Sequence, residues 1–165
     1  MNFRSYFKST VAGERGFTLI ELLVVILIIG ILAAIAIPSF LNQKGKAVDA
    51  SAKELGHTAQ IAAESYSTDH SGDYSGLSKA NLATYEATIT TASGSGNAWV
   101  QCVGAAGSTA ACAGNAGPTG YTIEIDPASG GERFFLSRQN GSIHRTCLVN
   151  NATGASGGGC VGGTW

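Results

Sequence analysis

The sequence predicts an α+β fold in which a long N-terminal helix packs under a small antiparallel β-sheet with disulfide-closed loops. Three observations predict it: an apolar run from Leu22 to Ile37, a 3.5-residue repeat of small and apolar residues after it, and alternating strand patterns further on. The 165 residues fit one compact domain and exclude a three-domain enzyme. The formal charge of -1 excludes a protein that holds nucleic acid by bulk electrostatics.

The N-terminal segment has the general layout of an export signal. Residues 1–16 carry three basic residues against one acid, and an apolar run over 17–37 follows, interrupted only by Thr18 and Glu21. As a helix this run would be about 31 Å long, close to the thickness of the hydrocarbon core of a bilayer. We therefore expect residues 17–38 to span the cytoplasmic membrane, with the N-terminus in the cytoplasm and the bulk of the chain outside.

The helix is expected to continue beyond the membrane to about residue 68. Pro38 removes one backbone donor and Gly30 is a second weak point, so we expect a kink at these positions. Over 39–68 the helix is amphipathic, because small or apolar side chains recur at alternating steps of four and three. They are Leu41, Gly45, Val48, Ala52, Leu55, Ala59, Ala62 and Tyr66. A stripe with so few large side chains suits close packing under a sheet better than the alternative, a self-pairing coiled coil.

The strands are expected in the second half of the chain. Residues 69–98 form a connecting loop region with turn-forming residues near its start, and 85–91 have the composition of a short strand. An antiparallel meander follows over 99–149. Its clearest strand, 121–126, alternates so that every second side chain faces one side of the sheet. That apolar face needs a cover, and the helix stripe is the available one.

Two features mark the end of the meander and the tail. Asn140-Gly141 lies between two strand patterns and is a strong signal for a two-residue hairpin. Residues 150–165 form a glycine-rich C-terminal loop, which by composition alone would be called disordered. The cysteines in and before this loop argue against disorder.

Four cysteines lie outside the apolar segment, in the part expected to be exported, where disulfides persist: Cys102, Cys112, Cys147 and Cys160. Three pairings are open. Pairing Cys102 with Cys112 and Cys147 with Cys160 is favoured, because each bond closes a short glycine-rich loop that has little core of its own. Each bond would stabilise the fold by about 3 kcal/mol.

The sequence predicts neither an enzyme nor a cofactor or metal site. It contains no C-x-x-C spacing, nucleophile elbow or phosphate-binding glycine pattern in the right context. Arg133, Arg138 and Arg145 fall on neighbouring strands and could bind an anion such as DNA or a surface glycan. A solvated sheet face is the favoured interpretation of these arginines.

The segment around Glu21 resembles the class III signal and N-terminal helix of type IV pilins and pseudopilins. The resemblance covers about the first 45 residues and rests on Gly16-Phe17-Thr18-Leu19-Ile20-Glu21-Leu22-Leu23-Val24-Val25-Ile26 and the apolar run to Pro38. It implies that prepilin peptidase removes residues 1–16 by cutting between Gly16 and Phe17. It also implies that Phe17 is N-methylated, and that Glu21 pairs with the Phe17 amine of a neighbouring subunit. In the resembling family a disulfide often staples the C-terminal loop of the head, and a bond between Cys147 and Cys160 would match it in position.

The resemblance implies a structural function. A major type IV pilin is stored in the cytoplasmic membrane with its head outside. It polymerises with copies of itself into an extracellular filament, using an inner-membrane assembly platform and its ATPase motor. Such filaments serve motility, adhesion or DNA uptake. A pseudopilin of a type II secretion or competence system is the first alternative, and a monomeric membrane-anchored surface binding protein is the second.

Overall fold

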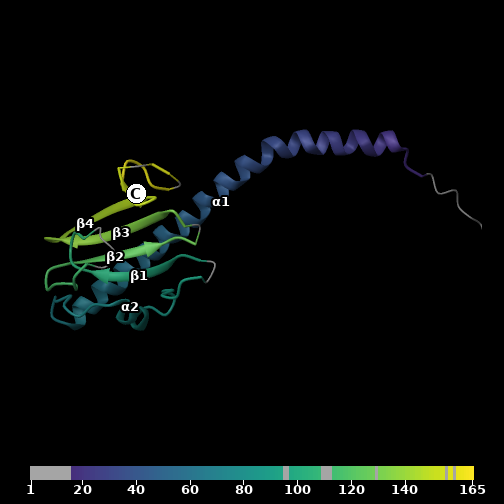
Figure 1. The fold of residues 1–165 in the computed structure, drawn as a ribbon. Helices are drawn as coiled ribbons and strands as arrows, with labels where there is room; N and C mark the ends of the chain where they lie inside the picture. The colour runs from purple at the N-terminus through teal and green to yellow at the C-terminus, as the bar shows by residue number, and fades with distance from the viewer. Residues whose placement is uncertain (1–15, 95–96, 109–112, 129, 155, 158) are drawn as a thin grey trace, which may run out of the picture. The chain divides into compact units, whose positions relative to one another are not determined.

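The computed structural model describes residues 16–94, 97–108, 113–128, 130–154, 156–157 and 159–165 (Figure 1). The chain divides into two compact units, Met1–Ser39 and Phe40–Trp165. One helix, α1 (Leu19–Asp69), runs through both units. This confirms the long continuous helix that the periodicity predicts. The leader expected at residues 1–16 lies outside the described residues except for Gly16.

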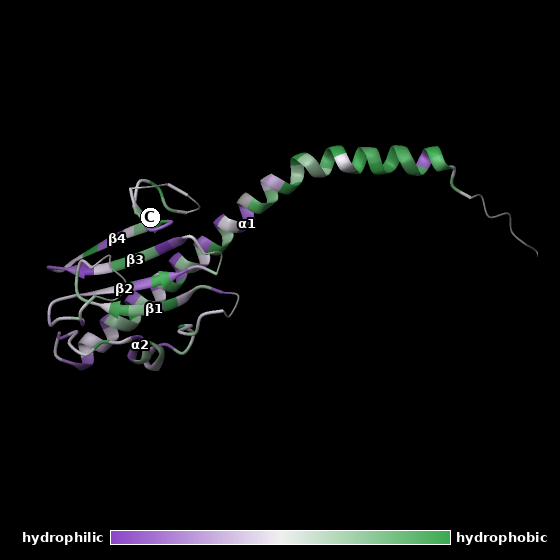
Figure 2. Cartoon of the chain, viewed as in Figure 1, coloured by the Kyte–Doolittle hydropathy of each residue, from purple (hydrophilic) through white to green (hydrophobic). Residues whose placement is uncertain are grey.

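The described part of the first unit is the apolar half of α1. Figure 2 shows this half almost uniformly hydrophobic. Its most apolar window has a mean hydropathy of 3.1, and none of that window is buried. By length and composition, α1 could therefore cross a membrane. The chain itself supplies no cover for these side chains among the described residues.

The second unit combines the other half of α1 with a five-stranded antiparallel sheet in sequence order, β1-β2-β3-β4-β5. The strands are β1 (Trp99–Gly104), β2 (Tyr121–Asp126), β3 (Glu132–Gln139), β4 (Ser142–Val149) and β5 (Ala152–Thr153). Because every neighbour in the sheet is also the neighbour in sequence, this is the predicted meander, extended by the short β5. Figure 1 shows α1 running behind the sheet.

Two tight hairpins fix the register of the last three strands. Asn140 and Gly141 adopt φ of 49° and 81° between the paired residues Gln139 and Ser142, as the sequence predicts. Asn150 and Asn151 make the same kind of turn between β4 and β5, with φ of 50° and 63°. Asparagine tolerates this left-handed conformation better than other non-glycine residues, because its short side chain can bond locally.

The connecting region differs from its prediction. No strand forms over 85–91; instead Lys79–Tyr85 forms the short helix α2. Ser78 caps it by accepting a hydrogen bond from the N–H of Asn81 at 3.3 Å, and Leu82 is its buried anchor. The β-favouring residues after α2 therefore lie in a turn and the loop that follows it, where Thr90 accepts a bond from the N–H of Val100 at 2.8 Å.

The core lies between α1 and one face of the sheet. On α1 the buried members of the stripe are Ala52, Ala59, Ala62 and Tyr66, and they pack against Tyr121, Ile123, Ile125, Phe134 and Leu136. The sheet thus occupies the stripe, so within the described second unit the coiled-coil alternative is wrong. Leu41, the first residue of the stripe, is exposed, and burial of the stripe begins at about Val48.

The opposite face of the sheet is not simply solvated. Thr122, Glu124 and Phe135 point away from α1, yet all three are buried. Glu124 forms an ion pair with Arg133 at 2.8 Å across the neighbouring strands. Strict alternation therefore identifies which side chains face the helix, but it does not reveal that both faces of β2 are covered.

Candidate functional site

The start of α1 carries the residues that the sequence singles out. Gly16 and Phe17 precede the helix, and Thr18 is its N-cap residue. The N–H and Oγ1 of Thr18 donate to Glu21 Oε2 at 2.9 and 2.8 Å, and the N–H of Glu21 donates back to Thr18 Oγ1 at 3.2 Å. This reciprocal arrangement is a capping box, which satisfies backbone donors that the first turn leaves unpaired.

The capping box gives Glu21 a role within its own chain. Its carboxylate lies at the positive end of the helix, where a negative charge is favourable. The same carboxylate is exposed to whatever surrounds the first unit. It can therefore accept a further donor without leaving the helix end.

Packing within the described part of the chain does not require glycine at Gly16 or Gly30. A Cβ added at either position would meet nothing within 4 Å. Gly30 and Pro38 both lie within continuous helix, and Pro38 leaves the carbonyl of Ala34 without its helical donor. The kink expected at these two positions remains a prediction.

The second site is the disulfide between Cys147 and Cys160, which closes a loop of sequence separation 13 and is buried. The predicted pairing of these cysteines is confirmed. The pairing of Cys102 with Cys112 remains a prediction, because Cys112 lies outside the described residues. The Cys147–Cys160 bond ties the tail to β4, the strand next to the short edge strand β5.

Two side chains of α1 hold the tail from the other side. Asp49 Oδ2 accepts from the N–H of Gly159 at 2.7 Å, and Lys53 Nζ donates to the carbonyl of the same residue at 2.6 Å. Both the backbone N–H and the carbonyl oxygen of Gly159 are therefore hydrogen-bonded to side chains of α1. We call Asp49, Lys53 and Gly159 the tail clasp.

Trp165 closes the tail over the core. Its indole N–H lies 2.9 Å from the carbonyl oxygen of Thr146 and 3.3 Å from that of Phe135. Its ring packs edge-on against Phe134. Adding a Cβ to Gly56 on α1 would bring it to 3.2 Å from the Trp165 ring. The glycine-rich tail is thus fixed to both the sheet and the helix.

Because Asp49, Lys53 and Glu64 fall outside the small and apolar stripe, the periodicity of the helix predicts that they face water, which is wrong for Asp49. It is only 1% exposed. Glu64 accepts bonds from Tyr74, Tyr121 and Arg138, at 2.7, 3.2 and 2.8 Å. A signal was present: Asp49 adjoins Val48 of the stripe and lies one turn from Gly45 and Lys53, so a broader buried face includes it.

The three arginines of the meander do not form one anion-binding cluster. Arg138 and Arg145 face α1, where they bond Glu64 and Gln60 at 2.8 and 3.2 Å. Arg133 is five residues from Arg138 on β3, so its side chain leaves the opposite face of the sheet. A single basic surface for DNA or a glycan is therefore absent from these residues.

Comparison with known proteins places the resemblance at the same N-terminal segment. Residues 12–37 match the family described as the prokaryotic N-terminal methylation motif. Over 40 residues the chain is 59% identical to the type IV major pilin protein PilA of Myxococcus xanthus (strain DK1622), which covers 24% of this chain and 18% of that relative. The matched region thus spans about a fifth of the relative's length. No solved structure matches the chain.

The matched residues include Gly16, Phe17, Thr18 and Glu21, whose geometry is described above. The N-terminal resemblance to type IV pilins is therefore confirmed, and the long helix, antiparallel sheet and Cys147–Cys160 disulfide agree with an α+β pilin fold.

Proposed function

We propose that the chain is a structural subunit of a type IV pilus, polymerised through its N-terminal helix. One observation carries the proposal: the first half of α1 is a fully exposed apolar surface with a single carboxylate near its start. An exposed apolar surface of this extent needs lipid or other chains around it. Lipid would surround this surface while the chain is stored in the membrane, and the helices of other subunits would surround it in the filament core.

Processing follows from the residues before the helix. Cleavage after Gly16 would make Phe17 the N-terminal residue directly before the capping box, and N-methylation would leave its amine basic. Because a Cβ at Gly16 would clash with none of the residues from Gly16 onward that the structure describes, a requirement for glycine there would come from the peptidase. The partner enzyme would be a prepilin peptidase, as the motif implies.

Glu21 would then have two roles in succession. In the unassembled chain it caps its own helix through Thr18. In the filament it would pair with the Phe17 amine of a neighbour, so that two charges share one low-dielectric site. Removing one member of a buried pair typically costs about 3–5 kcal/mol, because the other charge remains unpaired.

The test compares Glu21→Leu with Thr18→Ala in cells that have no other source of this chain. Glu21→Leu removes both roles, whereas Thr18→Ala weakens only the cap, by about 1 kcal/mol. We expect both variants to be inserted and cleaved. Thr18→Ala should yield filaments and Glu21→Leu few or none, as counted by electron microscopy of sheared surface material. Wild-type filament numbers from Glu21→Leu subunits would refute the pairing role.

A pseudopilin of a secretion or competence system is the second candidate, because it would share the same N-terminal motif. The disulfide-closed, clasped tail favours a pilin, since surface filaments face proteases and shear. Mass spectrometry of sheared filaments discriminates the two candidates. A pilin predicts abundant filaments made of this chain, with residues 1–16 missing and one methyl group on Phe17. A monomeric anchor predicts an intact leader and no filaments.

A further inference from the structure

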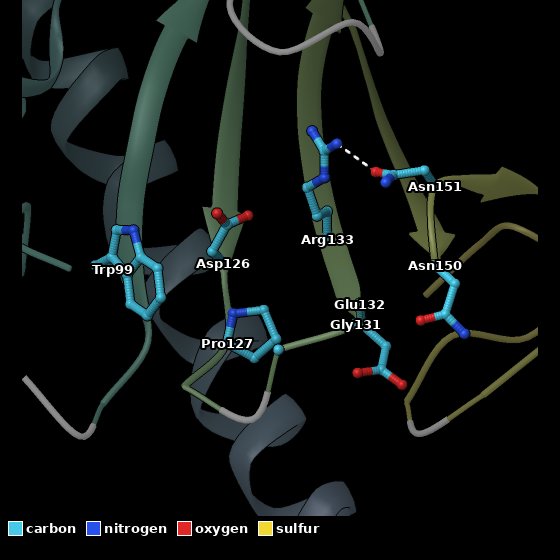
Figure 3. A pocket seen from close by; sticks show the side chains of 9 residues that line it. Trp99, Asp126, Pro127, Gly131, Glu132, Arg133, Asn150 and Asn151 are labelled. Carbon is cyan, nitrogen blue, oxygen red and sulfur yellow. Dashed lines mark hydrogen bonds between the residues drawn. The ribbon is translucent and has the colours of Figure 1, made fainter. Parts of the chain in front are cut away.

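A pocket of about 400 Å³ lies at one end of the sheet. Its lining residues come from β1, β2 and β3, from the turn between β2 and β3, and from the turn between β4 and β5 (Figure 3). The polar and aromatic ones are Trp99, Asp126, Glu132, Arg133, Asn150 and Asn151. These residues lie in the meander and its turns, apart from the capping box and the tail clasp.

The pocket contains a carboxylate oxygen without a partner. Asp126 Oδ1 is buried and accepts no hydrogen bond from any residue that the structure describes. Arg133 lines the same pocket, but it bonds Glu124 at 2.8 Å and Asn151 instead. A buried acceptor left unpaired destabilises the fold, so a ligand that donates to Asp126 would recover part of this cost.

Charge and ring chemistry decide what kind of donor fits. Asp126 and Glu132 bring two carboxylates to the pocket, and the guanidinium of Arg133 is already paired with Glu124, so the local charge is negative. Trp99 pairs with Asp126 in the register of β1 and β2, which puts the indole beside the unpartnered carboxylate (Figure 3). An indole face attracts cations and also packs against methylene groups.

We propose that this pocket binds an alkylammonium group, with its N–H donating to Asp126 and its methylene chain against Trp99. The ligand is either a free small amine or the side chain of a lysine on a second copy of this chain. Both sources present the same chemical group. The proposal is independent of filament formation, because it concerns only the folded second unit.

The experiment uses the full chain in detergent micelles, with 15N in the indoles. The sequence holds two tryptophans, so two indole signals are expected, and Trp99→Phe identifies which signal belongs to Trp99. The probe is n-butylammonium chloride in phosphate buffer at constant ionic strength, and n-butanol is its neutral match. We expect a saturable shift of the Trp99 signal with the amine alone, while the Trp165 signal stays in place.

Two variants test whether binding of the amine depends on the charge of Asp126. Asp126→Asn keeps the shape of the pocket and should weaken binding at least about tenfold, the expected loss of a charge-assisted bond. Glu54→Gln makes the same change in net charge on an exposed position of α1 and should leave binding unchanged. An unmoved Trp165 signal in each variant reports that the fold is intact, since that indole is bonded to β3 and β4.

The dependence on pH gives a second readout. Burial, with Glu124 nearby, raises the pKa of Asp126 to about 6, and Arg133 opposes this shift. Burial also raises the pKa of Glu132. Binding should therefore be weaker at pH 5 than at pH 7. A Trp99 shift that grows with protein concentration alone would identify the lysine of a second copy as the source. No saturable shift, an equal shift with n-butanol, or equal affinity in Asp126→Asn would overturn the proposal.

Discussion

The tail clasp and the Cys147–Cys160 disulfide hold neighbouring residues, and their independence can be tested. The perturbation is Asp49→Ala, made both in the native chain and in a chain in which Cys147 and Cys160 are serines. The Trp165 indole is bonded to Phe135 and Thr146. If these bonds keep the tail docked without the disulfide, Asp49 still bonds Gly159 in the chain that has serines at 147 and 160. The two perturbations should then be additive.

The magnitudes follow from the geometry. A disulfide that closes a loop of about this length is worth about 3 kcal/mol in the chain-entropy model. The bond from the Gly159 N–H to Asp49 is 2.7 Å long and charge-assisted, and such bonds contribute about 1.5–3 kcal/mol. We therefore expect Asp49→Ala to lower the free energy of unfolding by about 1.5–3 kcal/mol in both backgrounds.

The assay is urea unfolding of the detergent-solubilised chain, followed by indole fluorescence. Trp165 reports directly, because its ring is packed between the helix and the sheet. The control is Ser51→Ala, an exposed position of α1 near Asp49 that makes only a local bond to the carbonyl of Val48. If Asp49→Ala has no effect in the disulfide-free chain, the disulfide is what docks the tail and the reasoning fails.

Three further predictions follow from other parts of the chain. Gly16→Val should leave an uncleaved precursor in the membrane while the head folds normally, as checked by intact mass; a cleaved product would contradict a glycine requirement at the peptidase. Gly56→Val should lower the free energy of unfolding of the second unit by about 1–3 kcal/mol. The reason is that the added Cβ lies 3.2 Å from the Trp165 ring and 3.4 Å from Ile125. An unchanged melting temperature would show that the ring moves freely. Asp126 binds its proton more tightly in the folded chain than in the unfolded one, so its contribution to stability is present below about pH 4 and is lost as pH rises through about 6. Asp126→Asn should flatten this part of the stability profile, and an unchanged slope between pH 4 and 6 would show that another group causes it.

The parts of the fold that the sequence predicts well are those with strong local signals. The long helix follows from the apolar run and the 3.5-residue stripe, and the β3–β4 hairpin follows from Asn140-Gly141. The Cys147–Cys160 bond follows from short spacing in a segment without a core of its own. In each case the residues that decide the structure lie close together in the sequence.

The features that escaped prediction depend on distant partners or weak local patterns. The helix α2 has a single buried side chain, Leu82, so it leaves no apolar period to detect. The turn at Asn150-Asn151 puts two consecutive asparagines into a conformation that usually signals itself by glycine. Asp49 looked like an ordinary solvated acid because its partner, Gly159, is 110 residues away.

The candidate site at the start of α1 was located by its motif, but its geometry was not foreseen. The sequence motif pointed to Glu21 as a partner for another subunit. The capping box with Thr18 shows that the carboxylate also has a task before any partner arrives. The spacing of Thr18 and Glu21 was itself the signal for that cap.

The tail clasp also bears on the order in which the head becomes native. Lys53 and Asp49 reach Gly159 across 106 and 110 residues of intervening chain. Such nonlocal contacts raise the contact order and slow folding, because a large loop must close before they contribute. The half of α1 that packs under the sheet is synthesised early, but the strands that cover its small-residue face come later, and Trp165, which covers Gly56, comes last. We therefore expect native packing of the head to be a late, cooperative event that follows synthesis of the tail, and not a gradual process that tracks elongation.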